Sequence, residues 1–242
     1  MKAVLLLVSP CCACLTAPLE WEPWDIVRPG AFGLSLRPAL FGIYRVEGDF
    51  TAETPAKGTL TQTDSGDLEG RFGLALEVEY FVTSNWMLAA GVDYRVYDID
   101  GLNPIQGLDV EVETVETLQY YLGLRHLFAP FASRPRLRPY VQGTLVYLPE
   151  VDIGFEVDLS AFGSSNLEID AKGDGYWVAG VATGLMYHWT PQLVAELGIA
   201  YELPLTSLDA DLTFSIGPSL VPFEAELEPE GLIGFWGLTY FF

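Results

Sequence analysis

The sequence predicts an all-β protein built as an eight-stranded antiparallel up-and-down β-barrel, and three observations carry this prediction. From residue 31 onward apolar residues alternate with small or polar ones at a period of two, which is typical of strands, and no long window shows helical spacing. The connections between the alternating segments are short and long in turn. The chain also ends on the apolar stretch GLIGFWGLTYFF, residues 231–242, although the last residues of a soluble domain are usually loose and wet unless they are docked.

The first 17 residues, MKAVLLLVSPCCACLTA, have the outline of a secretory signal, with one lysine, a short apolar run and small residues before a cut near Ala17. All three cysteines, Cys11, Cys12 and Cys14, lie inside this stretch, so the mature chain would carry no disulfide framework. A lipid anchor on Cys14 is the alternative. We therefore expect a signal peptide at 1–17, a short leader at 18–30 and the barrel at 31–242.

Eight segments show the strand pattern. They lie near 32–47, 70–82, 86–98, 112–128, 139–152, 175–189, 193–205 and 231–242. Short turns follow the second, fourth and sixth segments, at 83–85, 129–138 and 190–192, and long connections follow the first, third, fifth and seventh. This asymmetry is typical of a barrel that spans a membrane, with both chain ends on the short-turn side. The connection at 206–230 has the length and the apolar pattern for an added hairpin.

The two faces of the strands differ in side-chain size. One face carries large aliphatic and aromatic residues, whereas the other carries glycine and alanine with a few charges. No lysine falls in a strand segment, since Lys57 and Lys172 lie in long connections. A soluble lipocalin-like barrel also alternates, with its apolar face inside, and a soluble sandwich with an apolar last strand is a further alternative. Because a water-facing strand is normally rich in Lys and Glu, we place the apolar face outward, toward lipid.

The end of the chain carries a resemblance to a known class. Trp236, Leu238, Tyr240 and Phe242 share one face of the last segment, and this pattern resembles the C-terminal signal of bacterial outer-membrane barrels that the barrel-assembly machinery reads. With its strand number and loop asymmetry, the chain from 31 to 242 resembles the small eight-stranded barrels related to the outer-membrane protein A transmembrane domain and to outer-membrane proteins X and W. The resemblance implies a Gram-negative outer membrane, short periplasmic turns, long extracellular loops, and contact with outer-membrane lipid and lipopolysaccharide.

Charged residues fall on the face that we place inside the barrel. The basic members are Arg37, Arg45, Arg71, Arg95 and Arg125, the acidic members are Glu77, Glu79, Asp93, Glu196 and Glu202, and Gln119 and Tyr121 lie between them. An unpaired charge in a narrow interior is costly, so a balanced set predicts a salt-bridged network that plugs the lumen. A gated or narrow polar path is the alternative reading.

Acidic residues dominate the long connections. The chain has 33 Asp and Glu against 12 Lys and Arg, a net charge of -21, which argues against a nucleic-acid partner. An acidic rim of this kind can bind divalent cations, bridge through them to lipopolysaccharide, or meet an extracellular protein partner. Asp170 and Asp174 are the candidate metal ligands, and we expect no other cofactor. The strand pattern also continues into these loops, which indicates a protruding sheet.

These features favour a structural or surface-interaction barrel with a closed lumen, serving envelope integrity or adhesion. The first alternative is a narrow passage for small apolar molecules, in the manner of protein W-like barrels. The second is a lipid-modifying enzyme, which would need a base from His126 or His188 beside a nucleophile. Lipid A deacylases carry a His and a Ser two residues apart, whereas Leu127 and Phe128 follow His126 here, so we assign no catalytic residues.

Overall fold

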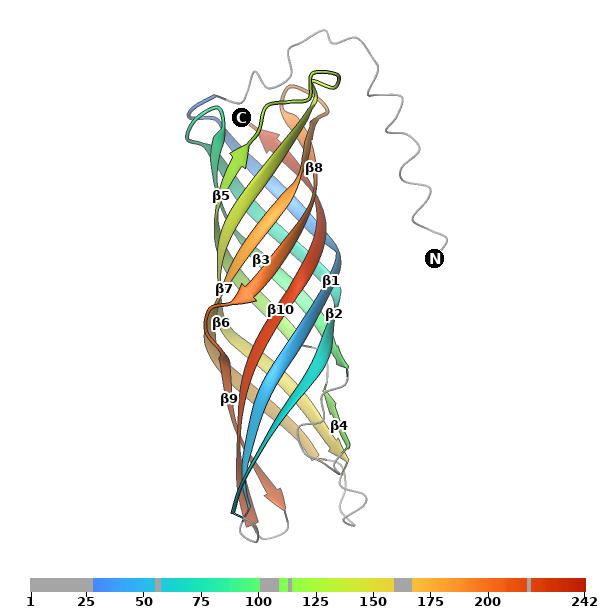
Figure 1. The fold of residues 1–242 in the computed structure, drawn as a ribbon, viewed down its shortest axis with the longest axis vertical. Helices are drawn as coiled ribbons and strands as arrows, with labels where there is room; N and C mark the ends of the chain where they lie inside the picture. The colour runs from blue at the N-terminus through green and yellow to red at the C-terminus, as the bar shows by residue number, and fades with distance from the viewer. Residues whose placement is uncertain (1–27, 55–57, 101–108, 113–114, 159–166, 217–218) are drawn as a thin grey trace, which may run out of the picture.

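The computed structural model describes residues 28–54, 58–100, 109–112, 115–158, 167–216 and 219–242 (Figure 1). The expected signal peptide and most of the expected leader lie outside these ranges. Within them the chain forms strands and turns, and none of the described residues belongs to a helix long and apolar enough to cross a membrane.

Eight long strands hydrogen-bond into a closed antiparallel ring, which confirms the predicted barrel. Around the ring the order is β1–β2–β3–β5–β6–β7–β8–β10 and back to β1, while β4 pairs only with β6, and β9 pairs with β10 and at one position with β7. The strands are β1 (Phe32–Thr54), β2 (Gly58–Phe81), β3 (Trp86–Asp100), β4 (Asp109–Val112), β5 (Val115–Leu127), β6 (Leu137–Asp158), β7 (Leu167–His188), β8 (Leu193–Pro204), β9 (Leu208–Ile216) and β10 (Ser219–Phe241).

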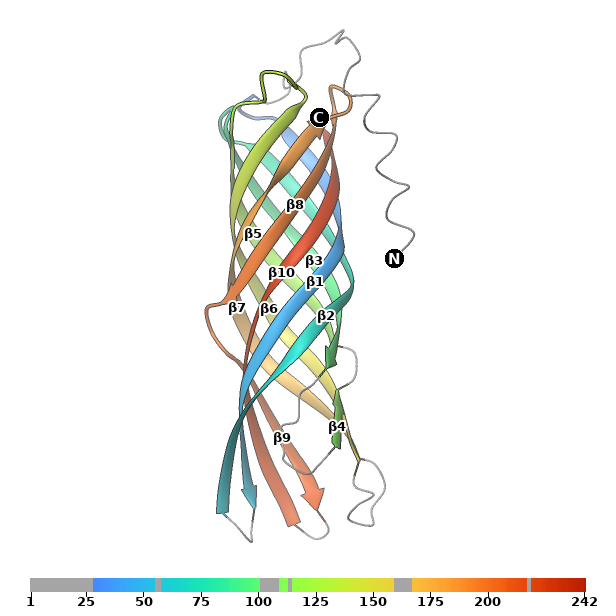
Figure 2. The same ribbon diagram turned by 45° about the vertical axis from the view of Figure 1, so that its right-hand side comes forward.

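The two ends of the barrel differ as the loop lengths predicted. The short turns and the C-terminus lie together at one end, and strands β1, β2, β9 and β10 extend far beyond the ring at the other (Figures 1 and 2); we call these the short-turn end and the hairpin end. Two short turns use one device, because the Oγ1 of Thr83 accepts from the backbone N–H of Trp86 at 3.0 Å and that of Thr190 accepts from Leu193 at 3.0 Å. Such threonine-capped turns need only a few residues.

The last strand closes the barrel, as its apolar ending indicated. β10 pairs with β1 from Gly33↔Phe241 onward, and the backbone N–H of Phe242 donates to the carbonyl of Phe32 at 2.9 Å. The rings of Phe32 and Phe242 lie 5.7 Å apart on the outside of the seam. The final aromatic residues therefore complete the wall.

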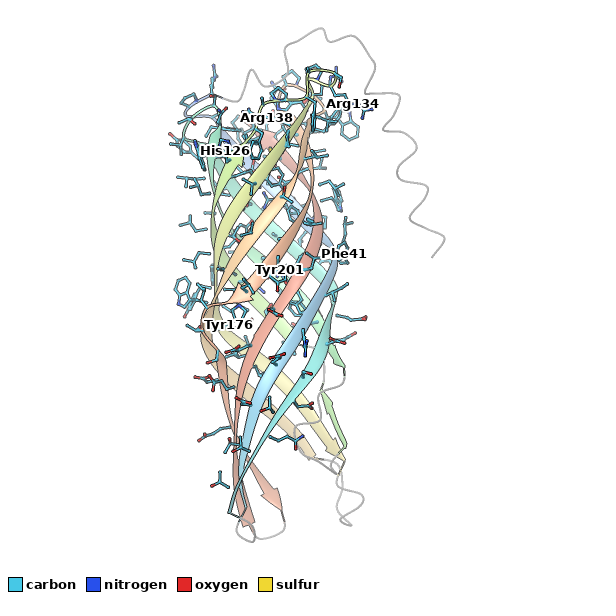
Figure 3. All side chains as sticks on the ribbon, viewed as in Figure 1. Phe41, His126, Arg134, Arg138, Tyr176 and Tyr201 are labelled. Carbon is cyan, nitrogen blue, oxygen red and sulfur yellow. The ribbon has the colours of Figure 1, made fainter. Side chains whose placement is uncertain are left out.

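A belt of apolar side chains covers the outside of the barrel, so the predicted outward apolar face is confirmed. It includes Leu36, Leu76, Val92, Leu122, Val181, Leu197 and Ile199, each more than a third exposed. Tyrosines at the edge of the belt nearer the hairpin end donate to carboxylates beyond it, since Tyr94 reaches Glu116 at 2.7 Å and Tyr201 reaches Glu230 at 3.2 Å (Figure 3 labels Tyr201). An apolar band bordered by aromatic residues is the surface that a transmembrane barrel shows to lipid.

Two β-bulges reverse the side-chain alternation toward the hairpin end. In β1 the partners of Ala39 and Phe41 are adjacent in β10, so Leu40 is an extra residue, and in β2 the extra residue between Gly70 and Phe72 is Arg71. One extra residue exchanges the inner and outer faces of everything that follows. Odd-numbered side chains of β1 therefore point inward on the short-turn side of the bulge and outward on its hairpin side.

This reversal corrects the placement of Arg45. The period-two pattern put Arg45 inside the barrel, but the bulge turns it outward, where its side chain is 59% exposed and pairs with Glu47 at 3.2 Å. Tyr44 and Val46 point inward instead.

The hairpin end is longer than the expected strand boundaries, which confirms that the strands continue past the belt. β9 and β10 form the added hairpin, with register pairs from Ser219↔Ile216 to Leu227↔Leu208. Many outward side chains here are carboxylates, among them Glu47, Asp49, Glu226 and Glu228, and the buried inward ones include Val46, Leu208 and Leu227. On the short-turn side of the bulges the barrel has apolar residues outside and buried charges such as Arg37 and Glu79 inside, and on the hairpin side it has exposed carboxylates outside and apolar residues inside, as in a water-soluble barrel.

Candidate functional site

The lumen is the candidate functional site, and glycines in its wall leave room for the large side chains that fill it. A Cβ on Gly198 would lie 2.5 Å from the hydroxyl of Tyr140, and one on Gly91 would lie 2.8 Å from that of Tyr121. Both tyrosines lie over glycines of nearby strands and occupy space that a larger residue there would fill. The small inward residues of the sequence therefore make room for large polar side chains in an interior that is only just wide enough for them.

Two arginines and three glutamates form a cluster in the short-turn half of the lumen, which we call the plug. Arg125 Nη1 lies 2.6 Å from Glu196 Oε2 and 3.1 Å from Glu79 Oε1, and Arg37 Nε lies 2.7 Å from Glu196 Oε1. Glu77 pairs with Arg37 and lies 3.5 Å from Arg125. All five side chains are at most 8% exposed. Their pairing across four strands ties opposite walls together.

Two further contacts fix the orientation of Arg125. Its Nε donates to Gln142 Oε1 at 2.7 Å, and its guanidinium carbon lies 4.5 Å from the centre of the Tyr140 ring. A buried charge is held best by hydrogen bonds in addition to its counter-charges, and these contacts add one hydrogen bond and a ring face to the carboxylates around Arg125.

A second ionic group, which we call the latch, lies closer to the hairpin end. Arg95 holds Glu202 with two hydrogen bonds of 2.9 and 3.0 Å and contacts Asp93 at 2.6 Å. The hydroxyl of Tyr44 donates to Glu202 at 2.8 Å, and that of Tyr97 accepts from Arg95 at 3.3 Å. The latch spans the lumen from β1 and β3 to β8.

Between the plug and the short-turn end, apolar side chains fill the mouth of the barrel. This group, the stopper, contains Ala31, Phe81, Met87, Leu127, Tyr140, Met186, Val194 and Phe241, all at most 6% exposed. Because the stopper is apolar and packed, water and ions would have to displace it as well as the plug. Three successive layers thus close the described lumen.

Small cavities remain between these layers. One of about 70 Å³ lies between plug and latch, beside Arg37 and Tyr121. Another of about 60 Å³ lies beyond the latch, and we call it the chamber. A third, of about 30 Å³, is lined both by outward residues such as Phe41 and Phe72 and by the inward Arg95, at the place where the β1–β2 pairing lapses between Pro38↔Leu74 and Ile43↔Glu69. We call this third cavity the window (Figure 3 labels Phe41).

The structure brings eight of the ten sequence-selected lumen charges inside the barrel. These are Arg37, Arg95, Arg125, Glu77, Glu79, Asp93, Glu196 and Glu202. Arg45 is outside, and the side chain of Arg71 is not among those described. The sequence reading missed the stopper and the roles of Tyr44, Tyr140 and Gln142, because an inward aromatic or amide has no distinct signature in an alternating strand.

The remaining candidate residues lie elsewhere. Trp236, Tyr240 and Phe242 are exposed on the outer wall of β10, beside the partly exposed Leu238. His126 packs between Trp86 and Phe128, with ring centroids 4.5 and 5.0 Å away, and His188 is only 1% exposed. The side chains of Asp170 and Asp174 are outside the described set, and the described residues contain no group of three or more His, Cys, Asp or Glu arranged to hold a metal ion.

Neither a protein-family model nor a curated protein matches the chain. Similar solved structures include the outer membrane protein OprG from Pseudomonas aeruginosa, 16% identical over 89% of this chain and 99% of its own, with a TM-score of 0.47. The outer membrane protein AlkL in lipid bilayers is 20% identical over 93% of this chain and 95% of its own, with a TM-score of 0.48. Neisserial surface protein A is 15% identical over 81% and 97%, with a TM-score of 0.34. The fold assignment itself rests on the strand ring and the apolar belt described above.

Proposed function

We propose that this protein is a closed, non-conducting barrel of the bacterial outer membrane, whose acidic hairpin end interacts with the cell's surroundings in envelope integrity or adhesion. The observation that carries the proposal is the triple closure of the lumen by latch, plug and stopper. Because no solute crosses a barrel sealed in this way, its function would depend on its outer surface and on its protruding strands. The hairpin end is then extracellular and the short-turn end periplasmic.

The outer face of β1, β9 and β10 supports a role in surface interaction. Glu47 lies opposite Glu228 across the β1–β10 pair, and Asp49, Glu226 and Asp209 form one row across three strands. All five side chains are exposed. Like charges directly opposite each other destabilise a sheet, so this arrangement costs stability that an outer cationic partner would restore. Divalent cations bridging to lipopolysaccharide supply that charge.

The test is binding of the barrel, held in lipid nanodiscs, to lipopolysaccharide monolayers with and without Ca²⁺. We expect Ca²⁺-dependent binding that is lost when Glu47, Asp49, Glu226 and Glu228 are all changed to their amides. Unchanged heat-modifiable gel mobility is the control for folding. Equal binding by the wild type and the neutralised variant would contradict the surface role.

The window favours a second candidate function, a narrow passage that releases small apolar molecules sideways into the membrane. It joins outward and inward residues where the wall lacks pairing. A Cβ on Gly73 would lie 2.9 Å from that of Ala39, which is shorter than the roughly 3.5–4.5 Å of a disulfide. A small outward shift of this unpaired part of the wall would therefore let Ala39→Cys and Gly73→Cys form a disulfide that closes the window. Uptake of an alkane into barrel-containing liposomes that stops on oxidation and resumes on reduction would establish this function. No uptake by the unlocked barrel would eliminate it.

A further inference from the structure

The chamber differs chemically from the part of the lumen on the short-turn side of the latch. Its wall is made by inward apolar side chains, among them Val46, Val115, Leu148, Val178, Leu208 and Leu227, each at most 6% exposed. They enclose the cavity of about 60 Å³ beyond the latch. Since about 10–15 Å³ of such cavity volume holds one water-sized group, the chamber has room for a short ligand.

Among the described residues that line the chamber, Gln119 carries a buried oxygen without a hydrogen-bond partner. Gln119, on β5, is 3% exposed and lines the cavity, and its Nε2 donates to Thr117 Oγ1 at 3.2 Å. Its Oε1 is buried, and none of the described residues donates a hydrogen bond to it. A buried acceptor left unpaired is costly, so this oxygen favours any molecule that brings a donor into the chamber.

The other polar groups at the chamber floor already have partners. Glu202 is engaged by Arg95 through two hydrogen bonds and by the hydroxyl of Tyr44. Tyr97 accepts from Arg95. Gln119 Oε1 is therefore a fully buried acceptor that remains for a ligand, with Tyr176 also in the lining, and the walls around it select for an apolar body.

We propose that the chamber binds a short molecule with an apolar body and one hydrogen-bond donor at its end, a hydroxyl or an amino group, with the donor on Gln119 Oε1. An alkane of the same length would fill the apolar space but leave this oxygen unpaired, and a site with a buried hydrogen-bonding group discriminates strongly against such analogues. Binding requires neither an open lumen nor passage through the window. The site thus goes beyond both functions proposed above.

The experiment is an NMR titration of the barrel, labelled with ¹⁵N at glutamine and held in lipid nanodiscs, with pentanol, pentylamine and pentane. We expect saturable shifts of the Gln119 side-chain amide with pentanol or pentylamine and none with pentane. Gln142 is the internal control, because its Oε1 already accepts from Arg125 at 2.7 Å. The tighter of the two donors identifies an alcohol or an amine as the ligand class. Shifts of equal size with pentane, or none with any of the three, would overturn the proposal.

The variant Gln119→Leu separates ligand recognition from a merely structural role. It removes the unpaired oxygen while keeping an apolar wall, so pentanol binding should fall about tenfold, the equivalent of one hydrogen bond. Pentane binding should appear in the same variant. Binding of pentanol and of pentane is measured by nuclear Overhauser effects between the ligand and the methyl groups of Leu148 and Leu208. Unchanged pentanol binding in Gln119→Leu would refute the assignment, whereas barrel closure is tested separately by its conductance.

Discussion

Arg125 and Arg45 are both arginines paired with glutamate, but their surroundings are opposite. Arg125 is fully buried among Glu79, Glu196 and Gln142, whereas Arg45 and its partner Glu47 are each more than half exposed. Removing one partner of a buried network leaves desolvated charges without compensation, while an exposed pair is screened by water. The same substitution should therefore have very different effects at the two positions.

We predict that Arg125→Ala lowers the free energy of unfolding by about 3–5 kcal/mol, since it leaves the plug's three carboxylates with Arg37 alone. The matched control Arg45→Ala should change it by at most about 1 kcal/mol. Urea unfolding in detergent micelles or liposomes, followed by tryptophan fluorescence, measures both values. Equal losses at the two positions would mean that the plug contributes no more than a surface pair.

At the scale of the strand, the bulges in β1 and β2 decide which side chains face inward. The sequence contains the alternation on both sides of them, but nothing in LRPALFGIY marks Leu40 as the inserted residue. When the inward and outward alternation of residues 32–39 is extended unchanged along β1, Arg45 falls on the inner face. The faces of β1 on the short-turn side of the bulge were predicted correctly because its apolar face is continuous from Phe32 to Leu36.

Deleting Leu40 and Arg71 together should remove both bulges and reverse the faces of the outer β1–β2 hairpin. Glu47 and Asp49 would then point into the chamber, and we expect no heat-modifiable barrel to form on refolding. The paired substitutions Leu40→Ala and Arg71→Ala keep the residue count and should refold. Efficient refolding of the double deletion would show that the bulges do not set the orientation.

The end of β10 supports a further prediction at this scale. Phe242 is 73% exposed, and its contacts are one backbone hydrogen bond to Phe32 and ring contacts with Phe32 and Tyr240, so its deletion should lower stability only slightly. If the terminal aromatic is an assembly signal, deletion should instead lower the amount of folded barrel in cells. We expect normal refolding of the deleted chain in vitro and a reduced heat-modifiable fraction in the outer membrane of producing cells. A parallel loss in both assays would assign Phe242 a packing role only.

For the whole molecule, the sequence contained the barrel, its closure by the last strand and most of its inner charges, because each of these follows from a period of two that extends over many residues. The stopper, the chamber and the window could not be read from it. They depend on which inward side chains from strands far apart in sequence meet at one level, as Phe81 and Phe241 do at 5.4 Å between ring centroids. That level is fixed by strand register, which the alternation leaves open.

The most direct test of the closed lumen is to refold the mature chain into a planar lipid bilayer and record current, while gel mobility with and without boiling is followed on the same sample. A heat-modifiable species that carries no single-channel steps is the result that latch, plug and stopper predict. Regular conductance steps from the same folded species would contradict the closure on which the proposed function rests.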